Sequence, residues 1–449
     1  DAAGSPLDVR VNAPSCVPAT HLETSGARLE AADLMSLLSE PKVLGLAEVM
    51  NFPGVIQGDP EIIAKLCAFH GRIIDGHCPG LSGHRLSAYA AAGISSDHEC
   101  VTVEEAREKL RVGLAIFLRE ASNARNLRDL LPLVTPANER RLCLCTDDRH
   151  PIDLLGDGSI DHLVRLAIAG GIDPVTAIRM ATLNTAEHYR LRDRGAVAPG
   201  RRADLVVFSD LSAPRAEEVF VSGELEARGG RMIHDRRHRR YDHLPRTVHI
   251  DPERLDFAIR AVGSQARVIG VIPDQLLTHH LTREVPVHDG WAQADPERDL
   301  LKMAVIERHH GTGNIGLGFV QGVGLTRGAI ASTVAHDHHN LVVIGADDVS
   351  MRTAARAVAA AGGGLAVAVG ERELTVLALP IAGLMSDWQI EHVRDKMQRL
   401  LDDAHRLGAR LRDPFMAMSF LALEVIPALK LTDQGLVDVE QFEVVPLFV

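Results

Sequence analysis

Two adjacent carboxylates, Asp147 and Asp148, stand where a short apolar strand should end. Residues 142–145 predict a buried strand, and residues 146–151 predict the turn that ends it. An unpaired carboxylate is costly to bury, so sheet packing gives no reason for the pair. In an active site one carboxylate can hold a metal or accept a proton while the other binds substrate. An isolated Asp-Asp pair would more simply cap a turn, but other strand ends in this chain carry similar groups.

Three further apolar runs end in residue types that bind metals. These runs and the residues that follow them are 43–47 with Glu48, 71–76 with His77, and 92–97 with His98 and Glu99. Each run precedes a segment of helical character, for instance residues 102–118. Alternating strands and helices predict a parallel α/β barrel, which gathers catalytic groups at the C-terminal ends of its strands. The four strand ends together would form a ligand set suited to zinc, iron or manganese.

Longer motifs accompany these strand ends. They are Pro-Ser-Cys-Val-Pro-Ala-Thr at 14–20, Met-Asn-Phe-Pro-Gly-Val at 50–55, Asp-Gly-His at 75–77, Ser-Asp-His-Glu at 96–99, Cys-Thr-Asp-Asp-Arg at 145–149, and Gly-Ala-Val-Ala-Pro-Gly-Arg-Arg-Ala-Asp-Leu at 195–205. Two C-terminal stretches, 267–274 and 309–314, continue the pattern. With these motifs the chain resembles the bacterial adenine deaminases of the amidohydrolase superfamily over nearly its whole length.

The resemblance implies an α/β fold in three parts. Residues 1–185 would form a metal-dependent (β/α)8-type barrel, residues 186–243 a portion of a small β domain with a linker, and residues 244–449 a C-terminal α+β domain. In this interpretation residues 8–12 correspond to the third barrel strand, and no His-x-His metal motif occurs in the first hundred residues. We therefore expect a barrel that lacks its first two strands and a chain that is catalytically incomplete as given.

The resemblance also implies an activity, the hydrolytic deamination of adenine to hypoxanthine and ammonia in purine salvage. Glu48, His77, His98 and Asp147 would bind a divalent metal, with two manganese or iron ions expected and zinc as an alternative. Asp147 would also accept a proton, and Asp148 would hydrogen-bond the purine, although the two roles could be exchanged. Another deaminase or a cyclic amidase of the same superfamily is the alternative, as is an incomplete barrel that serves as an assembly partner.

Two carboxyl groups are candidates for protonating the purine ring nitrogen next to the attacked carbon. One is Glu99, and the other is Glu120, which follows the apolar run 114–118 and could equally form a surface ion pair. Asn51 would line the substrate site or, equally, cap a turn. The C-terminal histidines at 309–310 and 336–339 could form a second metal site or reach the barrel mouth, but we favour polar loops at strand ends.

From residue 245 onward the sequence predicts a separate α+β unit packed against the barrel. Six strand candidates lie between glycine-rich turns, at 257–262, 267–272, 302–307, 314–320, 329–334 and 341–345. Asp347 or Asp348 would cap a helix that ends at the glycines 362–364, and a strand pair is expected across 365–379. Two more helices are expected at 387–407 and 414–430.

The net charge, the cysteine spacing and the length of the apolar runs limit the kinds of partner that we expect for this protein. A formal net charge of −12 over 449 residues argues against general nucleic-acid binding, and the basic cluster at 236–240 fits a solvated linker better than a polyanion site. The six cysteines show neither disulfide spacing nor the Cys-x-x-Cys of base-editing zinc deaminases. No apolar run is long enough to span a membrane. We expect a cytoplasmic homo-oligomer whose partner is a small-molecule substrate, adenine.

Overall fold

The N-terminal part of the chain is built on parallel strands that follow one another in sequence order. The computed structural model describes residues 5–234 and 245–449. The strands are β1 (Val11–Pro14), β2 (Val43–Val49), β3 (Ile73–Gly76), β4 (Ser96–Asp97), β5 (Ala115–Arg119) and β6 (Leu142–Cys145). Each pairs in parallel with its sequence neighbour within β1–β3 and within β4–β6. A hydrogen bond from Ser95 N to Ile74 O, 2.8 Å long, joins the two groups.

Helices connect these strands and bury their apolar faces. They are α1 (Ala31–Met35), α2 (Phe52–Gln57), α3 (Pro60–Ala68), α4 (Gly83–Ala91), α5 (Val103–Arg111), α6 (Leu127–Leu130), α7 (Pro151–Gly156), α8 (Ile160–Ala169), α9 (Pro174–Ala181) and α10 (Leu183–His188). Leu46 and Ile74 share one buried core with α3 and α4. Leu118 and Leu144 share another with α8 and α9. The strand–helix alternation expected of an amidohydrolase barrel is therefore present, and β1 begins at Val11, three residues later than the expected start at residue 8.

The helix expected over residues 102–118 is too long. Thr102 caps α5 as its side chain accepts a hydrogen bond from Glu105 N (3.2 Å), but the helix ends at Arg111. Gly113 has a φ of 97°, a left-handed conformation that glycine adopts without steric cost and that ends the helix. The apolar run that follows forms β5, which places Arg119 at a strand end.

A small antiparallel sheet follows the barrel strands. It contains β7 (Leu205–Val207), β8 (Glu218–Val221), β9 (Glu224–Arg228) and β10 (Arg231–Met232), in the order β10-β9-β8-β7. The strand expected at 218–221 is confirmed, and the one expected at 203–208 is shorter than expected. The basic cluster at 236–240 lies outside the described residues.

The C-terminal part is organised around an eight-stranded mixed sheet, in the order β13-β12-β17-β16-β19-β18-β20-β21. The strands of this part are β11 (Ile259–Arg260), β12 (Gln265–Val271), β13 (Thr278–Glu284), β14 (Val287–His288), β15 (Trp291–Ala292), β16 (Leu300–Ile306), β17 (Ile315–Gln321), β18 (Ala329–Ser332), β19 (Leu341–Gly345), β20 (Gly364–Val369) and β21 (Arg372–Ala378). Its main helices are α11 (Asp348–Ala360), α12 (Ile390–Arg406) and α13 (Pro414–Phe420). All six expected strands occur here; the strand at 341–345 has the expected bounds, and the other five have shifted ends.

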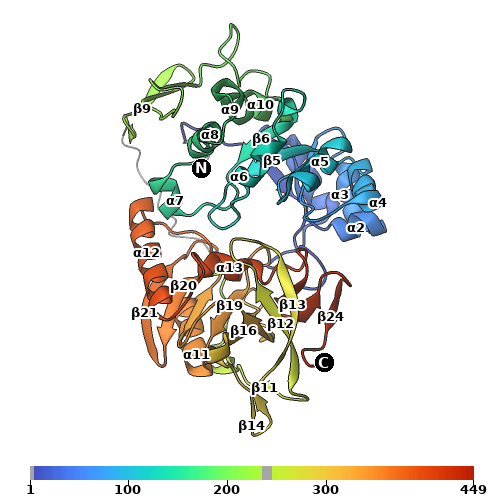
Figure 1. The fold of residues 1–449 in the computed structure, drawn as a ribbon, viewed down its shortest axis with the longest axis vertical. Helices are drawn as coiled ribbons and strands as arrows, with labels where there is room; N and C mark the ends of the chain where they lie inside the picture. Colours follow the sequence, from blue (N-terminus) through green and yellow to red (C-terminus); the bar gives the residue numbers. More distant parts are fainter. Residues whose placement is uncertain (1–4, 235–244) are drawn as a thin grey trace.

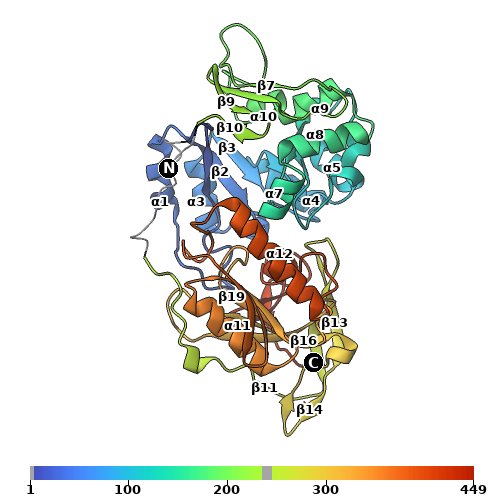
Figure 2. The same cartoon turned by 90° about the vertical axis from the view of Figure 1, so that its left-hand side faces the viewer.

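Alternating side chains of β16 show how this sheet is covered on both faces. Met303 and Val305 belong to the core that includes Leu400 of α12 and Phe415 of α13. Ala304, on the opposite face, belongs to the core that includes residues of α11. Figure 2 shows α11 and α12 beside the sheet. The two helices therefore bury opposite faces of one sheet, as the period of two along a strand requires.

The prediction of one helix in this part is wrong for its second half, which is not helical. The helix predicted at 414–430 ends at Phe420. The remaining residues lead into a small antiparallel sheet of β22 (Leu429–Thr432), β23 (Gly435–Asp438) and β24 (Glu443–Val445). Pro427, which cannot donate a backbone hydrogen bond, lies just before β22 and is poorly suited to a helix interior.

The C-terminal part packs against the barrel strands, as expected. His150 Nδ1 lies 3.0 Å from Asp413 Oδ2, and Arg412 Nη2 lies 2.7 Å from Asp153 Oδ1. The Thr20 hydroxyl donates a 2.5 Å hydrogen bond to Glu424 Oε1. In Figure 1 the blue-to-green barrel part lies above the yellow-to-red part. Among the helices of the described ranges, none combines the length and apolar character needed to cross a bilayer.

Candidate metal centre and substrate site

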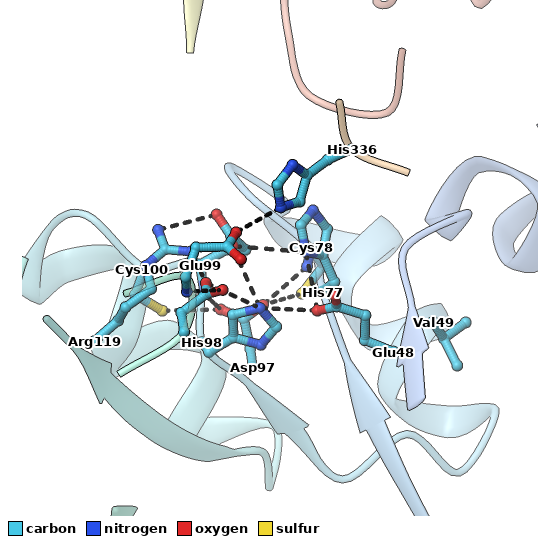
Figure 3. Close-up of polar contacts among 12 residues, drawn as sticks. Glu48, Val49, His77, Cys78, Asp97, His98, Glu99, Cys100, Arg119 and His336 are labelled. Carbon is cyan, nitrogen blue, oxygen red and sulfur yellow. Dashed lines mark hydrogen bonds and ion pairs between the residues drawn. The ribbon is translucent and has the colours of Figure 1, made fainter. Parts of the chain in front are cut away.

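Polar side chains gather where five neighbouring strands end. Glu48 is the penultimate residue of β2, and His77 follows β3 directly. His98 and Glu99 follow β4, Arg119 ends β5, and Asp147 and Asp148 follow β6. Figure 3 shows Glu48, His77, His98, Glu99 and Arg119 converging from separate strands. The C-terminal ends of parallel barrel strands meet on one face, so the fold brings together groups that lie about a hundred positions apart in sequence.

The four predicted ligands form a compact group. Glu48 Oε2 lies 2.8 Å from His98 Nε2 and 3.3 Å from His77 Nδ1. Asp147 Oδ2 lies 3.9 Å from His98 Nε2. One possible ligand set contains Glu48, His77 and His98, another contains His98, Glu99 and Asp147, and the ligand atoms of each lie within 4.8 Å of one another. His98 belongs to both sets, so the two candidate positions are adjacent.

The chemistry of this group fits a divalent cation. Neither ring nitrogen of His77 has a hydrogen-bond partner within the described part of the chain, although the side chain is buried. A buried polar atom normally has a partner, and a metal ion would provide one. Burial lowers the pKa of His98, but the neighbouring carboxylates, Glu48 foremost, outweigh this effect and raise it to about 10. The same negative charge would attract a metal cation.

Arg119 links two of the carboxylates, a role that the sequence did not reveal. Its guanidinium donates to Glu99 and, at 2.9 Å, to Asp147 Oδ2, and its side chain is only 1% exposed. Burial alone would raise the pKa of Asp147, but Arg119 and then His98 lower it below its ordinary value. Asp147 is therefore held as a carboxylate, the form that binds metals and accepts protons.

Behind these groups a buried ion pair fixes the loops that carry them. Lys109 Nζ lies 2.9 Å from Asp97 Oδ2, and both side chains are fully buried. Asp97 also accepts hydrogen bonds from Cys78 N (2.8 Å) and Glu99 N (3.1 Å). The segments that follow β3 and β4 are thereby tied to one carboxylate. Outer partners of this kind orient the groups that contact a metal.

Asp148 points away from the cluster of Glu48, His77, His98 and Asp147 (the metal-type group) and toward the C-terminal part. Asp147 has a φ of 52°, a left-handed conformation that Asp tolerates better than most residues, and this turn separates the two carboxylates. Asp148 Oδ2 lies 2.6 Å from His336 Nε2. The carboxylate also lines a largely apolar cavity of about 390 Å³. His336 lies in a loop between β18 (Ala329–Ser332) and β19 (Leu341–Gly345), as we favoured, and through this contact it also reaches the end of β6.

A larger cavity, of about 570 Å³, lies between Glu48 and the C-terminal part. Glu48 and Met50 line it from the barrel side, and Arg308, His309 and Asp337 line it from the other side. Burial raises the pKa of Asp337 to about 6. The cavity wall thus contains groups from both parts, and the C-terminal histidine segment contributes to it directly.

Asn51 and Glu120, two further residues predicted for the active site, have other surroundings than the proposed metal ligands. The Asn51 side chain accepts a hydrogen bond from Gly54 N (2.9 Å) and caps α2, which is the alternative role considered for it. Glu120 is buried, and its Oε2 has no partner among the residues described. Burial raises the pKa of Glu120 despite the opposing charge of Arg125. Glu120 belongs to neither of the two ligand sets.

Comparison with known proteins identifies both parts of the chain. Residues 1–225 match the amidohydrolase family, and residues 275–443 match the adenine deaminase C-terminal domain. The adenine deaminase of Desulfatibacillum aliphaticivorans is 53% identical over 100% of this chain and 79% of its own length. Adenine deaminase 2 of Carboxydothermus hydrogenoformans is 48% identical over 98% and 78%, respectively, and the adenine deaminase of Cereibacter sphaeroides strain KD131 shows the same values. The chain belongs to the adenine deaminase family of metal-dependent amidohydrolases.

Proposed function

We propose that this protein is an adenine aminohydrolase, which converts adenine and water into hypoxanthine and ammonia. The observation that carries the proposal is the convergence of Glu48, His77 and His98 from three strand ends into one possible ligand set. Relatives named adenine deaminase align along nearly the whole chain and support the choice of substrate.

We assign Glu48, His77, His98 and Asp147 as the residues that hold the metal, with two manganese or iron ions as the proposed occupants. A bound divalent metal would lower the pKa of water toward ~7, so that hydroxide is available near neutral pH. Two observations support this assignment. The ring nitrogens of His77 have no hydrogen-bond partner in the described chain, and three carboxylates, of Glu48, Glu99 and Asp147, belong to the possible ligand sets.

Asp147 is the proposed proton acceptor. The attacking oxygen adds to the ring carbon that bears the amino group, and Asp147 takes the proton that this oxygen releases. The same carboxyl group can then return the proton to the amino nitrogen, which leaves as ammonia. Its lowered pKa keeps Asp147 ionised before the reaction, as a general base requires.

The ring nitrogen next to the attacked carbon gains a proton as its double bond to that carbon is lost. Glu99 is the proposed donor because its Oε1 lies 3.4 Å from His98 Nε2, within the metal-type group. Glu120 is the second candidate, and its raised pKa favours a protonated carboxyl group. Separate Glu99→Gln and Glu120→Gln variants distinguish the two, because only the loss of the true donor should lower kcat strongly.

A substrate panel tests the proposed function. The full-length, metal-loaded protein should release ammonia from adenine much faster than from guanine or cytosine, and it should not open a cyclic amide such as hydantoin. Asp147→Asn, measured beside it, controls for contaminating deaminases. A preference for guanine, cytosine or the cyclic amide would replace adenine as the substrate and would leave only the amidohydrolase assignment.

A further inference from the structure

His336, a residue of the C-terminal part, makes a direct ion pair with Asp148 of the predicted substrate site. It lies between β18 and β19, in a segment that Figure 3 shows approaching the cluster from outside the barrel strands. Its Nε2 is 2.6 Å from Asp148 Oδ2. The contact therefore joins two sequence motifs that lie in different parts of the fold.

The imidazole of His336 is held firmly in this position. Its ring lies 4.6 Å from the ring of Phe420, with an interplanar angle of 30°. Its side chain is only 16% exposed. Burial lowers the pKa of His336, but Asp148 outweighs this effect and raises it to about 9. Near neutral pH the ring is therefore charged, and Nε2–H donates to the carboxylate.

Asp148 needs such a partner to act as a defined hydrogen-bond acceptor. Its side chain is 35% exposed, and Asp148 follows Asp147, which has a left-handed backbone conformation in the turn. The turn alone therefore does not fix the position of the carboxylate. The ion pair engages Oδ2. Among the described residues, Oδ1 takes part in no hydrogen bond or ion pair, which leaves this oxygen as an acceptor for a donor group of a ligand. Fixing a polar group before the ligand arrives lowers the cost of binding.

We propose that His336 is a positioning residue for Asp148, so that the C-terminal sheet completes the purine site across the boundary between the two parts. This inference rests on the proposed adenine aminohydrolase activity. His336 acts through Asp148 and is assigned no contact with the reacting atoms. The C-terminal domain then has a direct role in substrate recognition, in addition to its packing against the barrel.

Kinetics of full-length, metal-loaded variants test this role. His336→Ala should lower kcat/KM for adenine about 10–100-fold, as is typical for the loss of an orienting partner, and a higher KM should account for most of the change. Metal content should equal that of wild type, because Asp148 is not an assigned ligand. His336→Gln places an amide donor near the position of Nε2 and should restore most of the loss. His310→Ala removes a side chain that contacts Ser25 O across the same boundary and should leave the kinetics unchanged.

A double-mutant cycle separates positioning from a general structural role. If His336 acts through Asp148, His336→Ala should add little to the defect of Asp148→Asn. Independent, multiplying effects would overturn the proposal, as would wild-type kinetics in His336→Ala. Should that variant fail to fold, His336→Leu, which keeps apolar contact with Phe420, takes its place with the same expected result. A wild-type protein that releases no ammonia from adenine would instead overturn the proposed function, and the inference with it.

Discussion

The ammonium group of Lys109 lies 2.9 Å from the carboxylate of Asp97, and neither side chain is exposed to solvent. The same carboxylate accepts hydrogen bonds from the backbone of Cys78 and Glu99. Cys78 follows the predicted ligand His77, and Glu99 follows His98. This buried pair therefore connects a helix of the barrel to the segments that carry both histidines.

Lys109→Met should destabilise the protein by about 3–5 kcal/mol, because it leaves Asp97 buried without a counter-charge. The free energy of unfolding, measured by urea denaturation, reports this loss. Arg107→Ala on the same helix is the matched control. Arg107 pairs with Glu104 at 3.9 Å on the surface, so its loss should cost at most about 1 kcal/mol. Equal effects of the two substitutions would contradict the structural role of the buried pair.

His77→Ala should lower bound metal and adenine deamination together. The ring nitrogens of His77 have no hydrogen-bond partner in the described chain, so we expect metal binding to be their main role. Activity should fall by at least about 100-fold, the upper end of the loss seen for outer partners of a metal site. Metal analysis of the purified protein, beside an ammonia assay, measures both quantities. His84→Ala, at an exposed position of α4, should change neither, and full metal content in His77→Ala would remove this residue from the ligand set.

Asp148→Asn should weaken transition-state binding of adenine by about 1–3 kcal/mol, because a purine donor would lose a charged acceptor. The ratio of kcat/KM between wild type and variant gives this free energy. Metal content should not change. Unaltered adenine kinetics would remove Asp148 from the substrate site.

The ion pair of His336 with Asp148 predicts a specific pH dependence of stability. The folded protein keeps a proton on His336 up to pH about 9, whereas the ordinary pKa is 6.5. The contribution is therefore complete below pH 6.5 and is lost as the pH rises through about 9. Across this window wild type should lose up to about 3 kcal/mol more unfolding free energy than His336→Gln. Parallel curves from denaturant titrations at several pH values would contradict the charged pair.

The sequence could predict that the four proposed ligands follow strand ends, because each is marked by residues next to it in the chain. Glu48, His77, His98 and Asp147 each interrupt or follow an apolar run, and a short run that ends in a polar residue indicates a strand end. Parallel strands then place all four groups on one face. The C-terminal strands were also predictable, since fully buried strands such as β19 are continuous apolar runs bounded by turns.

Other parts of the site depend on contacts between distant residues. The sequence assigned no role to Arg119, and only its burial against Glu99 and Asp147 reveals one. His336 likewise finds its partner in another part of the fold. No local pattern encodes such a pairing, so the sequence alone favoured a polar loop.

We propose that adenine is deaminated at the cluster of Glu48, His77, His98 and Asp147. The most direct test measures hypoxanthine formation from adenine by the full-length protein, before chelation, after chelation, and after reconstitution with manganese or iron. We predict that chelation abolishes the activity of the wild-type protein and that reconstitution restores it, whereas His98→Ala stays inactive throughout. Full activity of the chelated wild type, or of His98→Ala, would contradict the account.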